Sequence, residues 1–319
     1  MTTTCAWCQA PREPGPTCPS CGANYAKAEA IKSRGRADAV AEVPLAPVEE
    51  FAQSVEMIRA APFDDGGVVY DPQLELKFCI AAIPTMFFLA LAFHASGFGH
   101  MLQRMFLAMP IHELGHAVTA WLCGFLAIPT LWFTRIADDR GLVAPLVLLG
   151  CVGFMMYRAW LAENRGLLLI GGAVLLLQAL GTLGIRGDTA QALVTFGGDG
   201  MGMVIATLLI ASFFFGKNSQ LYKGSLRWGF IAIGSAAFVD MYATWWAAWI
   251  DITNIPFGMI EGGTPSDALK LVEEYGWTKQ ALVRRYFALG MCCMVTVAAV
   301  YVWGVRRAWQ VAEAAKQRA

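Results

Sequence analysis

The chain has 319 residues, of which 57% are hydrophobic and only 15% are charged, and its mean hydropathy is +0.50. Soluble domains carry roughly 25% charged residues, so the composition excludes an ordinary soluble protein. The 24 basic and 24 acidic side chains cancel, and 11 Trp with 19 Phe are too many for a disordered chain. We therefore expect neither a nucleic-acid binder nor a flexible tail.

The first 25 residues contain four cysteines with paired spacing, Cys5-x2-Cys8-x9-Cys18-x2-Cys21. Two Cys-x2-Cys pairs supply the four thiolates that tetrahedral Zn²⁺ prefers, and four protein ligands leave no place for a substrate. No basic start followed by an apolar run precedes them, so we expect no secretion signal and a reducing cytosol, where zinc is favoured over disulfides. The sequence predicts a structural zinc ribbon at 1–25, which can also serve a protein partner.

The rest of the chain divides into a linker and juxtamembrane segment at 26–76, a transmembrane domain at 77–310 and a basic tail at 311–319. About 20 apolar residues cross a 30 Å hydrocarbon core as a helix. Seven segments come close to this length: 78–98, 105–126, 142–161, 167–185, 201–215, 226–250 and 286–305. We expect an all-α, multi-pass membrane protein with six to seven transmembrane helices. Lys77, before the first span, favours a cytosolic ribbon.

The second apolar segment contains the motif His112-Glu113-x-x-His116. On an α-helix the two histidines lie one turn apart on one face, so both imidazoles can bind one Zn²⁺ while Glu113 reaches a water molecule. Ionisable groups are costly in a lipid-embedded helix, which favours a functional role. A polar patch that joins helices by hydrogen bonds is the alternative, but it does not need two histidines at this spacing.

The letters HELGHA, with Gly124 about two turns later, resemble the site-2 protease family of intramembrane zinc metallopeptidases over about 78–215. The resemblance implies that an Asp-Gly element supplies the third zinc ligand, and its nearest counterpart is Asp199-Gly200, at the mouth of an apolar helix. The Asn-x-x-Pro turn of that family is missing here. Residues 128–142 alternate partly between apolar and polar and predict a short strand beside the metal helix. The resemblance implies that such a strand pairs with extended substrate.

Other carboxylates compete for the third position. Asp240 lies in an apolar segment with no nearby basic residue in the sequence, and a metal would keep it ionised. Asp199 is favoured over Asp240, and Glu163 and Glu261 are further alternatives at less suitable spacings. For Asp199 and Asp240, helix capping or helix packing would be the non-metal role.

Three more polar residues are expected to have structural roles. His94 and His100 follow the apolar part of the first span and are expected to be interfacial side chains. Asp267 follows Thr264-Pro265-Ser266, which predicts that its carboxylate caps the next helix as its third residue.

The sequence thus predicts an intramembrane zinc endopeptidase that acts on membrane proteins and holds one catalytic and one structural Zn²⁺. Glu113 would accept the proton of the attacking water. The glycines Gly115, Gly197, Gly198 and Gly200 are expected to line a water-filled cavity. The competing hypothesis is a non-catalytic membrane protein with a structural or transport metal site and a zinc ribbon for interactions.

Overall fold

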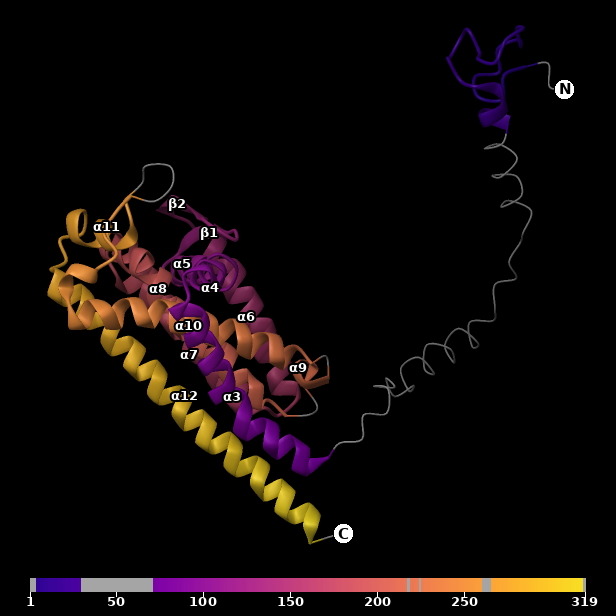
Figure 1. The fold of residues 1–319 in the computed structure, drawn as a ribbon. Helices are drawn as coiled ribbons and strands as arrows, with labels where there is room; N and C mark the ends of the chain where they lie inside the picture. The colour runs from indigo at the N-terminus through magenta and orange to yellow at the C-terminus, as the bar shows by residue number, and fades with distance from the viewer. Residues whose placement is uncertain (1–3, 30–70, 217–218, 224, 260–264, 318–319) are drawn as a thin grey trace. The chain divides into compact units, whose positions relative to one another are not determined.

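The computed structural model describes residues 4–29, 71–216, 219–223, 225–259 and 265–317. The chain forms two compact units, Met1–Val68 and Val69–Ala319. The larger unit is mostly helical (Figure 1). Its helices are α3 (Pro72–Ala95), α4 (Gly97–Gln103), η1 (Arg104–Ala108), α5 (Met109–Leu122), α6 (Val143–Leu161), α7 (Arg165–Ala179), η2 (Leu180–Gly184), α8 (Gly187–Ala211), η3 (Ser212–Phe214), α9 (Gln220–Lys223), α10 (Leu226–Ile250), η4 (Ile252–Asn254), α11 (Asp267–Glu273) and α12 (Lys279–Lys316). Strands β1 (Phe125–Pro129) and β2 (Thr134–Arg140) form an antiparallel pair.

Five helical segments within the described ranges are long and apolar enough to cross a membrane: Pro72–Ala95, Val143–Leu161, Arg165–Gly184, Gly187–Phe214 and Lys279–Lys316. Large apolar side chains cover the outside of α6 and α7, where Leu169 is 75% exposed and Phe154 is 65% exposed. Apolar surface of this extent is costly in water and is normal against lipid. The larger unit therefore has the character of a helical membrane domain.

The structure describes only part of the segments predicted before and after the membrane domain. Most of the predicted linker, 30–70, lies outside the described residues. The predicted tail at 311–319 is not separate from the last span, because α12 continues to Lys316.

Two of the seven predicted spans have no counterpart among these five helical segments. The segment 105–126 contains the π-helical turn η1 and then α5, whose 14 residues are too few to span alone. Pro110 lacks an N–H, so the regular bonding pattern is interrupted and Met109 N–H bonds to the oxygen of Arg104 instead. The segment 226–250 is helical as α10, but much of it is buried among the other helices and it is not one of the five.

Helix α8 is longer than its predicted span, 201–215, and this changes the position of the glycine-rich stretch. Asp199 and the neighbouring glycines lie within the helix, not at its mouth. A Cβ on Gly115 of α5 would lie 2.6 Å from the oxygen of Gly198 and 2.8 Å from the amide nitrogen of Gly202. The buried glycines therefore permit close packing of α5 on α8, and the cavity beside them stays a prediction.

The core of the domain joins α8, α10 and α12 through an aromatic stack. Tyr286 of α12 stacks on Trp245 of α10, with 3.9 Å between ring centroids, and on Phe196 of α8, with 4.2 Å between centroids. The Tyr286 hydroxyl also donates to the backbone oxygen of Phe196 over 3.1 Å. This stack fixes the start of α12 against α8 and α10. Figure 1 shows α3 and α12 running side by side.

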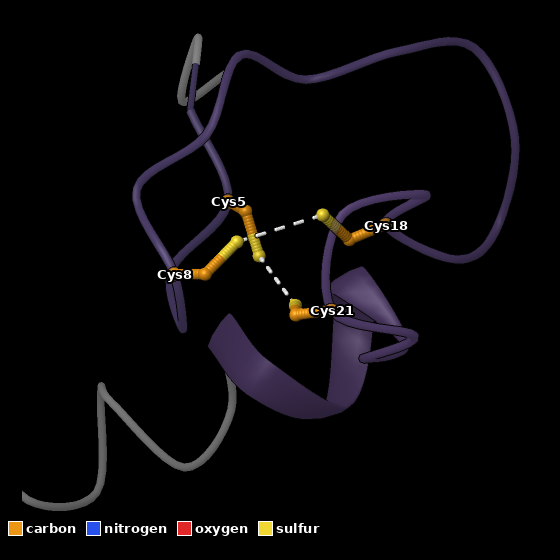
Figure 2. A group of neighbouring side chains, drawn as sticks. All are labelled: Cys5, Cys8, Cys18 and Cys21. Atoms are coloured by element: carbon orange, nitrogen blue, oxygen red, sulfur yellow. Dashed lines mark hydrogen bonds between the residues drawn. The ribbon is translucent and has the colours of Figure 1, made fainter.

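The smaller unit contains two turns with the same hydrogen-bonding pattern, one for each cysteine pair (Figure 2). The amide of Cys5 donates to Ala10 and that of Cys18 donates to Ala23. In each turn the residue four positions after the first cysteine adopts a left-handed backbone, with φ of 62° at Gln9 and 71° at Gly22. Glycine adopts this conformation without steric cost, whereas glutamine does not.

Gln9→Gly is therefore expected to stabilise the ribbon by about 1 kcal/mol, and Gly22→Ala is expected to destabilise it by about 1 kcal/mol. The measurement is the chelator concentration that removes half of the ribbon zinc from the full-length protein. Gln317→Gly makes the same chemical change at the end of α12 and is the control, which should leave this concentration unchanged. Equal chelator resistance in both ribbon variants would contradict the role assigned to these turns.

Candidate metal centre

The four sulfur atoms of the ribbon lie within 4.8 Å of one another. Cys5 Sγ is 3.9 Å from Cys21 Sγ, and Cys8 Sγ is 3.7 Å from Cys18 Sγ (Figure 2). Four sulfurs bound to Zn²⁺ at about 2.3 Å in a tetrahedron are about 3.8 Å apart. The arrangement of the cysteines therefore fits the metal that their spacing predicts.

Backbone amides favour the thiolate form of two of these cysteines. Hydrogen bonds from the amides of Cys8 and Trp7 lower the pKa of Cys5. Burial raises the pKa of Cys18, but the amides of Ser20 and Cys21 outweigh it and the pKa falls to about 6. Because a thiolate is the form that binds metal, the turns prepare these two residues as ligands.

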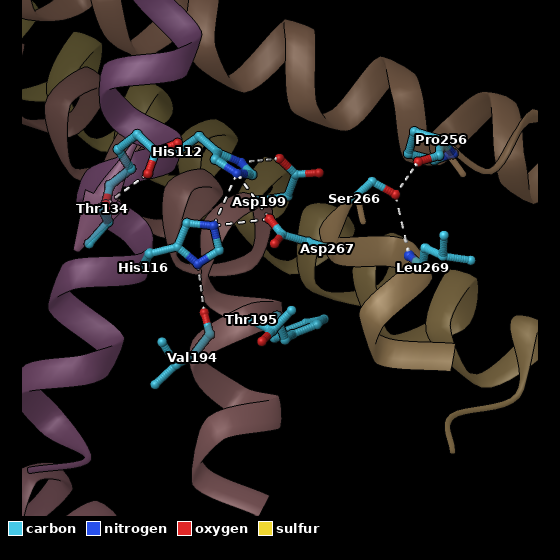
Figure 3. A network of polar contacts seen from close by, with 12 residues as sticks. His112, His116, Thr134, Val194, Thr195, Asp199, Pro256, Ser266, Asp267 and Leu269 are labelled. Carbon is cyan, nitrogen blue, oxygen red and sulfur yellow. Dashed lines mark hydrogen bonds and ion pairs between the residues drawn. The ribbon is translucent and has the colours of Figure 1, made fainter. Parts of the chain in front are cut away.

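A second group of possible ligands brings together α5 and α11 (Figure 3). His112 Nε2 and His116 Nε2 are 3.1 Å apart, and Asp267 Oδ2 lies 3.1 Å from the first and 3.0 Å from the second. Three atoms bound to Zn²⁺ at about 2.0 Å in a tetrahedral site are about 3.3 Å apart. The triangle formed by these atoms has nearly this size.

The outer nitrogens of both imidazoles are held by acceptors on α8 (Figure 3). His112 Nδ1 lies 2.8 Å from Asp199 Oδ1, and His116 Nδ1 lies 2.8 Å from the backbone oxygen of Val194. A carbonyl can only accept, so His116 Nδ1 carries the hydrogen, and an ionised Asp199 requires the same of His112. When both rings are neutral, both Nε2 lone pairs face the Asp267 carboxylate. A metal ion bound among these three acceptor atoms would balance them, so the residues fit a metal.

Asp267 reaches this position because α11 is anchored at its start. Ser266, not Thr264, is the N-cap, since its hydroxyl accepts from the amide of Leu269. The same hydroxyl donates to the oxygen of Pro256 over 2.9 Å. Asp267 is thus the first residue of α11, and the prediction that it caps the helix as the third residue is wrong.

Asp199, the residue favoured by sequence as third ligand, contacts the outer nitrogen of His112 and is not brought to the two Nε2 atoms. Its other carboxylate oxygen accepts from Trp245 Nε1 over 2.7 Å. A carboxylate in this position is of the kind that orients a histidine ligand of a metal, and the prediction that Asp199 itself binds the metal stays a prediction. Trp245 had no functional signal in the sequence.

Glu113 is held from the hairpin beside α5. Only 6% of the residue is exposed, and the hydroxyl of Thr134 lies 2.7 Å from its Oε2. Thr134 begins β2, which lies inside the segment 128–142 where a strand was predicted beside the metal helix. The prediction of that strand is confirmed, and the strand supplies a contact that fixes the Glu113 carboxylate.

The other candidate carboxylates lie elsewhere. Asp240 has the basic partner that its sequence neighbourhood did not reveal, because Arg104 Nη1 is 2.8 Å from Asp240 Oδ2. Glu163 follows α6 in a turn with a left-handed backbone and belongs to none of the metal groups found in the described residues. Glu261 lies outside the described residues.

Gly198→Ala tests how closely α8 approaches the imidazoles. A Cβ at this position would lie 2.6 Å from His116 Nε2 and 2.8 Å from His112 Nε2. We expect the substitution to displace the rings and to lower zinc affinity by at least roughly tenfold, which is the lower end of the effect of disturbing ligand orientation. Zinc titration measures this. Gly172→Ala on α7, where a Cβ meets nothing within 4 Å, is the matched control and should bind zinc as the parent protein does.

No protein-family model, no curated protein and no solved structure matches the chain. The class is therefore defined by the fold and the side chains alone. The chain is a mostly helical protein with five helices suited to a membrane among its described residues, and its geometry permits metal binding by a four-cysteine cluster and by clusters of histidine and aspartate.

Proposed function

We propose that the protein is an intramembrane zinc endopeptidase that hydrolyses peptide bonds of membrane-embedded or membrane-proximal proteins. The observation that carries this proposal is the convergence of His112 Nε2, His116 Nε2 and Asp267 Oδ2 within about 3 Å. Glu113 completes the motif on the same helix. The resemblance of HELGHA to site-2 proteases supports the same activity, with Asp267 in place of Asp199 as the third ligand.

The three ligands would leave one coordination position open, as catalytic zinc sites do. Zinc at this position would supply a Lewis acid that polarises the peptide carbonyl and makes water more acidic. Glu113 would accept the proton of the attacking water and pass it to the leaving nitrogen. Asp199 and the carbonyl of Val194 keep the two imidazoles in place, so the ligands need little rearrangement during the reaction.

The hairpin offers a place for the substrate. The sheet has only the two strands β1 and β2 within the described residues, so β2 keeps one edge without a strand partner there. An extended segment could bind along that edge, near Thr134 and Glu113. A substrate that crosses the membrane as a helix must first unwind, because a helix engages its own peptide groups in hydrogen bonds. We also assign the ribbon to the cytosolic side, as a structural zinc domain able to bind a protein partner.

Removing the metal tests the proposal directly. The purified full-length protein, reconstituted in liposomes with a transmembrane reporter, is expected to cleave the reporter, to lose this activity in a chelator and to regain it with Zn²⁺. Because the ribbon also binds zinc, the Cys18→Ser variant is the control and should still cleave. A protein that retains zinc yet cleaves no reporter would instead support a structural or transport metal site.

A further inference from the structure

A second cluster of potential metal ligands lies outside the motif. His94, His100 and Asp240 each place a nitrogen or oxygen within 4.8 Å of the others. The residues come from α3, α4 and α10, and none of them belongs to the His112–His116–Asp267 group. The sequence placed the two histidines at the membrane interface, so their contact with Asp240 is a new observation.

The two histidines meet because the chain bends between them. Positions six residues apart on a continuous helix point about 120° away from each other. Ser96 ends α3 and begins α4, and its hydroxyl accepts from the amide of Gly99. A Cβ on Gly99 would lie 2.8 Å from the oxygen of Phe93, so the bend needs glycine there. As a result, the rings of His94 and His100 are only 4.3 Å apart between centroids.

The distances within the cluster suit a shared ion better than direct hydrogen bonds alone. His100 Nε2 lies 3.0 Å from Asp240 Oδ1, but His94 Nδ1 lies 3.7 Å from the same oxygen. The second distance is too long for a hydrogen bond. His94 Nδ1 is nevertheless buried and has no hydrogen-bond partner among the described residues. Ligands of a tetrahedral zinc ion are about 3.3 Å apart, which is between the two observed distances.

Arg104 determines which oxygen of Asp240 is available. Its Nη1 lies 2.8 Å from Oδ2, so Oδ1 is left to face the two imidazoles. The Asp240 side chain is fully buried, whereas the side chains of His100 and Arg104 are 41% and 46% exposed. The cluster is therefore not enclosed by protein on the side of His100 and Arg104. The positive charge of Arg104 opposes a cation nearby and weakens its binding.

We propose that His94 Nδ1, His100 Nε2 and Asp240 Oδ1 form a second site for a divalent transition-metal ion, with Zn²⁺ as the probe. Two imidazoles and one carboxylate are ligands of the zinc class of ions. Water would complete the coordination on the exposed side. The site is weaker than the cluster of the motif because Arg104 is beside it.

Metal content tests the proposal without any measurement of cleavage. The full-length protein is titrated with Zn²⁺ against a competing chelator, and the bound metal per chain is counted. We expect the His94→Ala, His100→Ala double variant to bind one zinc fewer than the parent at saturation. Its remaining zinc should still be lost in part on adding His112→Ala, because the two clusters share no ligand. A double variant that binds as much zinc as the parent at every concentration would overturn the proposal.

Arg104→Ala distinguishes a metal site from an ion pair that happens to include two histidines. Removing the neighbouring positive charge should tighten zinc binding at this site by roughly tenfold, while the motif site keeps its zinc and so reports an intact fold. If Asp240 only pairs with Arg104, the substitution will produce no tighter binding, and that result counts against the site. Arg158→Ala, on α6 and outside the cluster, is the control for loss of an arginine.

Discussion

Glu113→Gln is expected to lower cleavage of a transmembrane reporter by roughly 10²- to 10⁴-fold, the usual contribution of a general base. Glutamine has nearly the same shape and its amide oxygen can still accept from Thr134, which lies 2.7 Å from Glu113 Oε2. It cannot accept a proton from water at neutral pH. The fold and the zinc content should therefore stay unchanged, and substrate can accumulate bound to the variant.

The comparison is made with the purified variant in the same liposomes, with zinc content measured on the same samples. Glu163→Gln, in the turn after α6, is the matched control and should cleave at the parent rate. Cleavage by Glu113→Gln at the parent rate would remove Glu113 from the reaction and with it the proposed mechanism.

Asp267→Ala is expected to lower zinc affinity at the motif far more than Asp199→Ala does. The first change removes an oxygen that lies 3.1 Å or less from both Nε2 atoms, and two ligands hold zinc much less tightly than three. The second removes a hydrogen-bond partner of His112, which typically costs roughly 10- to 100-fold in affinity. Cleavage should be lost with Asp267→Ala and reduced with Asp199→Ala.

The order of the two affinities decides between the ligands. Glu273→Gln, an exposed change on the same helix α11, controls for any effect of altering that helix. Loss of zinc with Asp199→Ala but not with Asp267→Ala would restore Asp199 as the third ligand, as the resemblance to site-2 proteases implies.

Local sequence patterns predicted those parts of the molecule that depend on neighbouring residues. The spacing of the four cysteines reflects two tight turns, and the i, i+4 histidines reflect one turn of α5, so these six residues were found from the sequence. The strand at 128–142 was also predicted by local alternation. Predicted spans such as 142–161 and 167–185 nearly coincide with Val143–Leu161 and Arg165–Gly184.

Contacts between distant segments could not be predicted in this way. Asp267 is 151 residues from His116, and the cap pattern before it already gave its carboxylate a sufficient local explanation. Asp240 and Arg104 are 136 residues apart, so the partner of that buried acid was equally hidden. The glycines before residue 201 suggested the mouth of a helix because their local propensity disfavours helix, whereas packing of α8 against α5 outweighs that preference.

The length of α12 leads to an expected depth of the motif in the bilayer. Exposed arginines occur on this helix at 284–285 and again at 306–307, and the stretch of about 21 residues from Arg285 to Arg306 is about 31 Å long as a helix. That is about the thickness of the hydrocarbon layer, so we expect each pair to lie near one of its boundaries. Tyr286, which stacks against Trp245, is one residue inside the first boundary. We therefore expect the two imidazoles to lie near this boundary, where water is available for the proposed hydrolysis and where a peptide bond leaving the hydrocarbon would arrive.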